Sequence, residues 1–137
     1  MALLKALNER ATEDGVRNFF EHEFKRIKAQ AGMSYVDLKS PVISDMPGGP
    51  KDGNSTDEKL SYHVQAKVWL ESVRRAINAM PAPEKHFLKL RYLDEMEWLD
   101  IEEKMNVTSR QGQYYIQRAF RYFADAFADT YDFLVFE

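Results

Sequence analysis

The sequence predicts an all-α protein that ends in a helix-turn-helix. Apolar residues recur at three- and four-residue intervals in several stretches, the spacing of amphipathic helices. Residues rich in proline and glycine separate these stretches and mark the ends of helices. The stretch 81–123 reads as three short helices, with a tight turn at Met105-Asn106-Val107 before the last of them.

The composition is that of an ordinary soluble domain. The chain has 137 residues, of which 45% are hydrophobic and 30% charged, and it has no cysteine. Disulfides, thiolate metal sites and cysteine nucleophiles are therefore excluded. No stretch approaches the roughly 20 apolar residues of a membrane span, and residues 1–7 are too short for the core of a signal peptide. We expect a cytoplasmic protein without a membrane partner.

An N-terminal helical segment is expected at 1–38. Thr12 is predicted to cap its helix, with Glu13 and Asp14 in the first turn, where acids complement the helix dipole. Gly32 is a plausible end of the helix. The apolar residues at helical spacing are Val16, Phe19, Phe20, Phe24 and Ile27.

Residues 39–56 are dense in Pro, Gly, Ser, Asp and Asn, so we expect a linker through which no helix persists. Its part from Gly48 to Ser55 resembles a phosphate-binding loop in the spacing of its glycines. However, Asn54 stands where that motif requires a lysine, and no buried strand precedes it. The sequence therefore gives no reason to expect a nucleotide cofactor.

A long central helix is expected to follow the linker and to open a helical domain at 57–130. Ser55 or Thr56 can cap it, and Pro81 ends it near residue 80. Its broad apolar stripe is predicted to pack on the C-terminal unit, on the N-terminal helix or on a second copy of the chain. His63 is placed on its polar side. The predicted stripe includes Leu60, Val64, Val68, Val73, Ile77 and Met80.

The helix-turn-helix itself is predicted at about 98–123. Asn106 occupies the turn position that needs a left-handed backbone, where Asn is the most tolerant residue after Gly. Thr108 or Ser109 is expected to cap the second helix, which Gly112 should weaken by about 1 kcal/mol relative to Ala. The expected inward residues are Trp98, Leu99, Ile101 and Met105 in the first helix, and Tyr115, Ala119, Phe120 and Phe123 in the second.

The outward side of the second helix carries side chains suited to reading DNA. Arg can form two hydrogen bonds to guanine, Gln can read adenine, and Ser and Tyr can hold phosphates. The chain has a net charge of −3, yet the only charged residues in 104–123 are positive. We expect the early positions to lie nearest the bases and the last two to contact the backbone. The candidate DNA-binding residues are Ser109, Arg110, Gln111, Gln113, Tyr114, Gln117, Arg118 and Arg121. The alternative is a three-helix bundle with a solvated basic face.

Two family resemblances support the DNA-binding interpretation. Leu90-Arg91-Tyr92-Leu93, together with the spacing of Trp98, Ile101 and Met105-Asn106-Val107-Thr108, resembles region 4 of the bacterial sigma-70 family. The upstream Ser-Pro, Met-Pro and Gly-Asn pairs of 40–54, followed by the long helix, are similar to the ArpU family of phage transcriptional regulators. This resemblance implies a regulator of phage or prophage late genes in a bacterial host cell. Its partners would be double-stranded DNA, RNA polymerase and a second copy of the chain.

Other functional classes have less support. His22, His63 and His86 lie in unrelated segments, and no arrangement of catalytic residues, metal ligands or cofactor-binding residues stands out, so we do not expect an enzyme. A DNA-packaging subunit resembling a small terminase stays an alternative. So does a protein-interaction module that binds polymerase, because acidic residues before Lys104 would repel phosphate. The aromatic tail 131–137 is expected to fold back on the core or to pair with another subunit.

Overall fold

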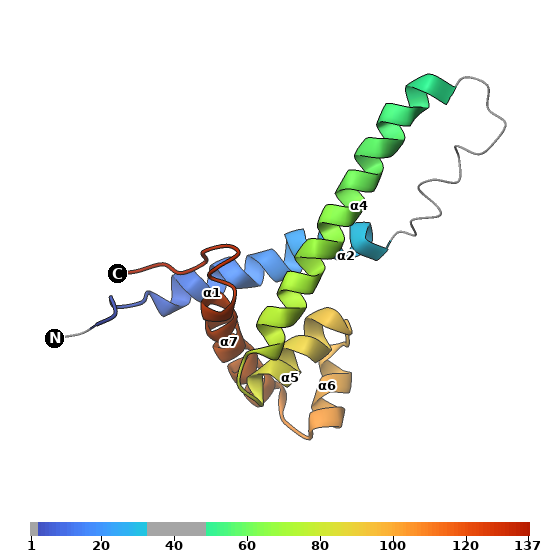
Figure 1. Ribbon diagram of the computed structural model, residues 1–137. Coiled ribbons are helices and arrows are strands. Elements are labelled where there is room, and N and C mark those ends of the chain that lie inside the picture. The colour runs from blue at the N-terminus through green and yellow to red at the C-terminus, as the bar shows by residue number, and fades with distance from the viewer. Residues whose placement is uncertain (1–2, 33–48) are drawn as a thin grey trace. The chain divides into compact units, whose positions relative to one another are not determined.

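The computed structural model describes residues 3–32 and 49–137, and within 49–60 it describes the backbone alone. The predicted all-α class is confirmed (Figure 1). In the described residues the one β-type pairing outside helices is an isolated antiparallel bridge between Leu7 and Phe136. None of the described helices combines the length and apolarity needed to cross a bilayer. The helices are α1 (Glu9–Asn18), α2 (Phe24–Gly32), α4 (Gly49–Asn78), α5 (Glu84–Leu88), α6 (Trp98–Met105) and α7 (Ser109–Ala126), with π-helical turns η1 (Phe19–Glu23) and η2 (Lys89–Leu93).

The chain divides into two compact units. The first joins Met1–Glu21 to Ser72–Glu137, and the second is His22–Glu71. This division differs from the predicted domains, which separate all of 1–38 from the C-terminal helices. The difference arises because α1 and the start of η1 pack against α7, so the N-terminal residues contribute to the unit that contains the helix-turn-helix.

Helix α1 begins one turn earlier than predicted. Asn8 caps it, with its side-chain oxygen accepting a hydrogen bond from the Ala11 nitrogen at 3.1 Å. Thr12 is fully buried, and its hydroxyl accepts a hydrogen bond from the Val135 nitrogen at 3.0 Å. The prediction of Thr12 as the cap was therefore wrong, because its hydroxyl holds the C-terminal tail. Helix α2 is described as far as Gly32, the last residue before 33–48, so the predicted helix end at Gly32 stays a prediction.

Helix α4 begins before its predicted start. It runs from Gly49, so that 49–56 of the predicted linker are helical, and it ends at Asn78. Pro50 is compatible with this start, because the first turn of a helix needs no hydrogen bond from the backbone nitrogen of its residues. The rest of the predicted linker, 39–48, lies outside the described residues.

The second unit corrects the predicted orientation of the central helix. His63 is 3% exposed, and its Nδ1 atom lies 3.0 Å from the carbonyl oxygen of Gln30. In contrast, Val64 and Val68 are exposed. The prediction that put His63 on the polar side was wrong, because its ring is satisfied by a backbone group of α2 and can therefore be buried.

The core of the first unit is a cluster of aromatic side chains between α1, η1 and α7. The Phe20 ring is completely buried and lies 4.8 Å from the Phe123 ring and 5.0 Å from the Tyr92 ring. Phe19 stacks on Phe123 at 6.2 Å. The apolar residues predicted at the end of α4 are also buried here: Val73, Ile77 and Met80. The inner side of α7 is thus covered by the N-terminal residues.

The C-terminal tail folds back on the same unit. Phe133 lies 5.3 Å from Phe19, and the Asn8 nitrogen donates to the Val135 carbonyl at 2.8 Å. The Glu137 nitrogen donates in turn to the Ala6 carbonyl at 3.0 Å. Of the two expectations for the tail, the structure therefore shows folding back on the core.

Candidate nucleic-acid interface

The turn between α6 and α7 has the predicted left-handed residue. Asn106 adopts φ 53° and ψ 52°, directly after the last residue of α6. The following nitrogen, of Val107, donates to the Glu102 carbonyl at 3.2 Å and so closes the end of the helix. A non-glycine residue adopts this conformation at a cost that is lowest for Asn and Asp. The prediction of a helix-turn-helix turn at Asn106 is confirmed.

The start of α7 is fixed by a capping box. The Thr108 hydroxyl accepts from the Gln111 nitrogen at 3.1 Å, and the Gln111 side chain accepts from the Thr108 nitrogen at 3.2 Å. This confirms Thr108 as the cap. The side chain of Gln111, a candidate base reader, is occupied within the turn and orients the helix instead.

Gly112 lies where α7 packs against Trp98, the first residue of α6. A Cβ atom added at Gly112 would stand 2.9 Å from the edge of the Trp98 ring. Trp98 is itself covered by Arg91, whose guanidinium lies 5.6 Å from the ring centre. Gly112 was expected only to weaken α7, but it also provides the small residue that leaves room for the Trp98 ring of α6.

We expect Gly112→Ala to lower the free energy of unfolding by about 1 kcal/mol. Crowding against Trp98 costs about 1–3 kcal/mol and outweighs the gain of about 1 kcal/mol from replacing Gly by Ala in a helix. Urea denaturation followed by circular dichroism measures the change. In a Trp98→Leu background, where the ring is absent, the same substitution should stabilise the protein. Stabilisation in the native background would contradict the close approach.

The first half of α7 presents an exposed surface, the leading surface, that carries no acidic side chain. Arg110 and Gln117 are exposed on it, Tyr114 is 53% exposed, and Gln113 is half-buried. Helix N-termini carry a partial positive charge and free backbone N–H groups, which favours phosphate here. The residues of the leading surface are Ser109, Arg110, Gln113, Tyr114 and Gln117.

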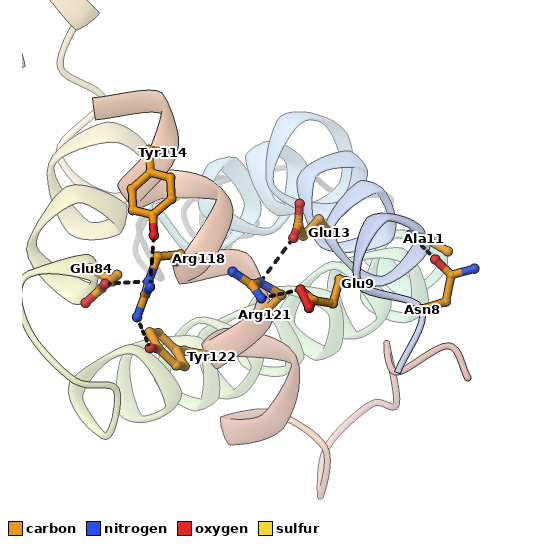
Figure 2. A network of polar contacts seen from close by, with 9 residues as sticks. All are labelled: Asn8, Glu9, Ala11, Glu13, Glu84, Tyr114, Arg118, Arg121 and Tyr122. Carbon is orange, nitrogen blue, oxygen red and sulfur yellow. Dashed lines mark hydrogen bonds and ion pairs between the residues drawn. The ribbon is translucent and has the colours of Figure 1, made fainter. Parts of the chain in front are cut away.

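Arg118 is held by three partners from two helices (Figure 2). Its Nε donates to Glu84 Oε2 of α5 at 3.0 Å, and its two terminal nitrogens donate to the hydroxyls of Tyr114 and Tyr122 at 3.0 and 2.8 Å. Glu84 is only 5% exposed, so loss of Arg118 would leave a buried carboxyl group without its ion-pair partner. The hydrogen bonds to Tyr114 and Tyr122 raise the pKa of the Arg118 guanidinium. Arg118 thus ties α5 to α7, a role not expected from sequence.

Arg121 points to α1 instead of the leading surface (Figure 2). It forms an ion pair with Glu9, and its Nε lies 3.1 Å from Glu13 Oε2. That second contact is an ion pair without hydrogen-bond geometry, because the buried Nε has no hydrogen-bond partner among the described residues. Burial raises the pKa of Glu13, an effect larger than the opposing charge of Arg121. A DNA phosphate, which Arg121 was expected to hold, would therefore have to compete with these two carboxylates for its guanidinium.

Acidic side chains gather on the α6 side of the motif. Asp94, Glu95, Glu97 and Asp100 are exposed in the connection and the first turn of α6, as is the apolar Leu99. Leu99 was expected in the buried side of α6, but it is 67% exposed. Phosphate approaching this side would be repelled, so the motif has a basic and an acidic side.

Sequence reasoning also missed buried residues. Ile116 is 1% exposed and belongs to the inward side of α7, whereas Tyr115, expected there, is half-buried and stacks on Phe87 at 4.9 Å. The four-residue spacing of Tyr114, Arg118 and Tyr122 was a readable signal for contacts along one side of a helix. No local signal pairs Glu84 with Arg118, since they are 34 residues apart.

Comparison with known proteins identifies the motif and a full-length relative. The family described as "Sigma-70, region 4" matches residues 70–122, which span the end of α4 through most of α7. A protein of Enterococcus hirae, named for a proposed role as autolysin regulatory protein ArpU, is 26% identical over 129 residues. The aligned part covers 93% of each chain. No solved structure matches the chain. Both resemblances drawn from the sequence are thereby confirmed.

Proposed function

We propose that the chain, which is similar to ArpU and carries a sigma-70 region 4-like helix-turn-helix, is a DNA-binding regulator that recognises specific sequences and controls transcription. The observation that carries this proposal is the leading surface. It combines Arg, Gln, Ser and Tyr side chains on the first half of the helix that such motifs insert into the major groove.

The proposed contacts follow from position along α7. Ser109 and Arg110 lie at its N-terminal end, nearest the bases, with Gln113 and Gln117 on the following turns. Gln111 would act indirectly, because its side chain is engaged with Thr108 and sets the angle at which the helix begins. Arg110 is the strongest candidate for reading guanine through two hydrogen bonds.

The proposed targets are phage or prophage late genes. The resemblance to the ArpU family suggests this class, and the Enterococcus hirae relative carries the name of an autolysin regulator. Control of a gene for a cell-wall lytic enzyme would be compatible with both the family resemblance and the name of this relative. The direction of control, activation or repression, depends on where the site lies relative to a promoter.

Selection from a pool of random double-stranded DNA at about 0.15 M salt tests the proposal, because nonspecific binding through phosphates is already weakened at that ionic strength. We expect enrichment of a defined site. Enrichment of no sequence above background would contradict sequence-specific recognition, whatever the affinity for bulk DNA.

We expect Arg110→Ala to weaken binding to the selected site by about 1–3 kcal/mol and to relax specificity at one base pair. Loss of a bidentate contact to guanine is the reason, and competition binding against single-base variants of the site measures it.

Arg121→Ala is the matched control for loss of an arginine from α7. Because this guanidinium is paired with Glu9 and Glu13, its removal should lower the free energy of unfolding by about 1 kcal/mol and leave base preference unchanged. Equal changes in base preference from Arg110→Ala and Arg121→Ala would contradict the assigned orientation of α7.

A second candidate is a protein-interaction module that binds RNA polymerase or another protein. The acidic α6 side favours it, because exposed carboxylates around Leu99 suit a basic protein surface better than DNA. Leu99→Asp separates the two functions. It should leave DNA binding intact under the first proposal and abolish polymerase binding under the second.

A further inference from the structure

Tyr114 stands out on the leading surface because its hydroxyl is already engaged from one side (Figure 2). The side chain is 53% exposed, yet its oxygen accepts a hydrogen bond from a terminal nitrogen of Arg118 at 3.0 Å. The ring is also fixed, since it packs edge-on against Tyr115 with the centroids 5.8 Å apart. An exposed tyrosine usually rotates freely, but this one is oriented.

The chemistry of the contact decides what the hydroxyl can do next. A phenol has one O–H donor and two lone pairs, whereas a guanidinium has donors and no acceptor. Arg118 therefore occupies a lone pair of Tyr114 and cannot accept its proton. The O–H must point to another acceptor, and the adjacent positive charge makes it a stronger donor.

Arg118 is itself immobilised by groups away from the leading surface. Glu84 of α5, with its side chain 6% exposed, accepts from Nε at 3.0 Å. The Tyr122 hydroxyl accepts from the other terminal nitrogen at 2.8 Å. The guanidinium is thus held on three sides, and a buried carboxylate on one helix determines the position of a hydroxyl on another.

We propose that the Glu84–Arg118 pair is a positioning device that presents the Tyr114 hydroxyl as a hydrogen-bond donor to a phosphate oxygen of DNA. The inference rests on the proposed function, because it assigns a role within the same surface. Glu84 and Arg118 are positioning residues here, and Tyr114 makes the contact. Phosphate is the acceptor because it is anionic and lies along the edge of the groove that α7 would enter.

Tyr114→Phe tests the contact directly, since it keeps the ring and removes only the hydroxyl. We expect affinity to fall about tenfold, equally for the selected site and for nonspecific DNA. The slope of log affinity against log salt should stay unchanged, because a neutral donor releases no counterion. A loss confined to the selected site would overturn the phosphate assignment in favour of a base contact.

Tyr131→Phe is the matched control. It also removes one tyrosine hydroxyl, on an exposed side chain of the C-terminal tail that belongs neither to the leading surface nor to the partners of Arg118. We expect its DNA affinity to stay within about twofold of the unaltered protein. A tenfold loss from this control would show that losing a hydroxyl outside the leading surface suffices, and it would overturn the specific role of Tyr114.

A double-mutant cycle tests whether Arg118 acts through Tyr114. Arg118→Lys keeps the positive charge but cannot reproduce the rigid fork that reaches three partners at once. It should weaken DNA binding several-fold alone and have no further effect when combined with Tyr114→Phe. Equal effects in both backgrounds would mean that Arg118 contributes charge or stability instead of positioning.

The unaltered protein separates this inference from the proposed function. If selection finds no preferred site, sequence-specific regulation fails, although a nonspecific phosphate contact by Tyr114 can still be measured. If a site is found but Tyr114→Phe binds as tightly as the unaltered protein, the positioning inference alone fails. Denaturation of each variant confirms that the protein used for binding is folded.

Discussion

Replacing Phe20 by Ala should lower the free energy of unfolding by about 3–5 kcal/mol, the largest effect expected of a single substitution in the N-terminal segment. The ring is fully buried and contacts Phe19, Tyr92 and Phe123, with centroids at 5.2, 5.0 and 4.8 Å. Removing it leaves a cavity beneath α7. Chemical denaturation, followed by circular dichroism, measures the loss.

The same experiment tests whether the N-terminal helix belongs to the DNA-binding unit. Phe136→Ala is the matched control, because that ring is 44% exposed and should contribute less than about 1 kcal/mol. If Phe20→Ala were as mild as the control, η1 would not be part of the core. If η1 is part of the core, Phe20→Ala should also weaken DNA binding, although Phe20 lies in no candidate contact surface.

Arg118→Ala is expected to cost about 2–4 kcal/mol of stability. It leaves the Glu84 carboxylate, 5% exposed, without its ion-pair partner. The side chain of Arg118 is 35% exposed, so water can partly replace it, which keeps the expected cost below that of a fully buried pair. Urea denaturation at neutral pH measures the change.

A double variant distinguishes loss of the pair from loss of packing. Adding Glu84→Leu to Arg118→Ala removes the stranded charge, and buried ion pairs can often be replaced by apolar groups at little cost. The double variant should therefore be more stable than Arg118→Ala alone. Equal stability of the two would show that water reaches Glu84 freely, contrary to its burial.

The local features of the motif could be predicted from sequence because each has a local cause. Asn106 lies in the turn since its side chain tolerates a left-handed backbone, and Thr108 caps α7 with the help of Gln111. The end of α4 near residue 80 follows from Pro81. The all-α class and the family resemblance depend on the same short-range patterns.

Features that depend on contacts between distant residues could not be predicted. Thr is a residue type that often caps helices, but the Thr12 hydroxyl accepts a hydrogen bond from the C-terminal tail instead. His63 is buried because a carbonyl group of α2 lies beside its ring. The two arginines late in α7 look alike in sequence. Only the fold shows that Arg118 meets Glu84 while Arg121 meets α1.

The packing of the chain ends onto α7 has a consequence for folding. The Arg121–Glu9 and Val135–Thr12 contacts join residues 112 and 123 positions apart, so they close very large loops. Closing such large loops carries an entropic cost, so these contacts are expected to form late in folding. During synthesis, α1 leaves the ribosome long before α7, the helix against which it packs, has been made. During translation the aromatic surface of Phe19 and Phe20 would be open to chaperones, and α7 would gain its support only once residues 131–137 have been synthesised.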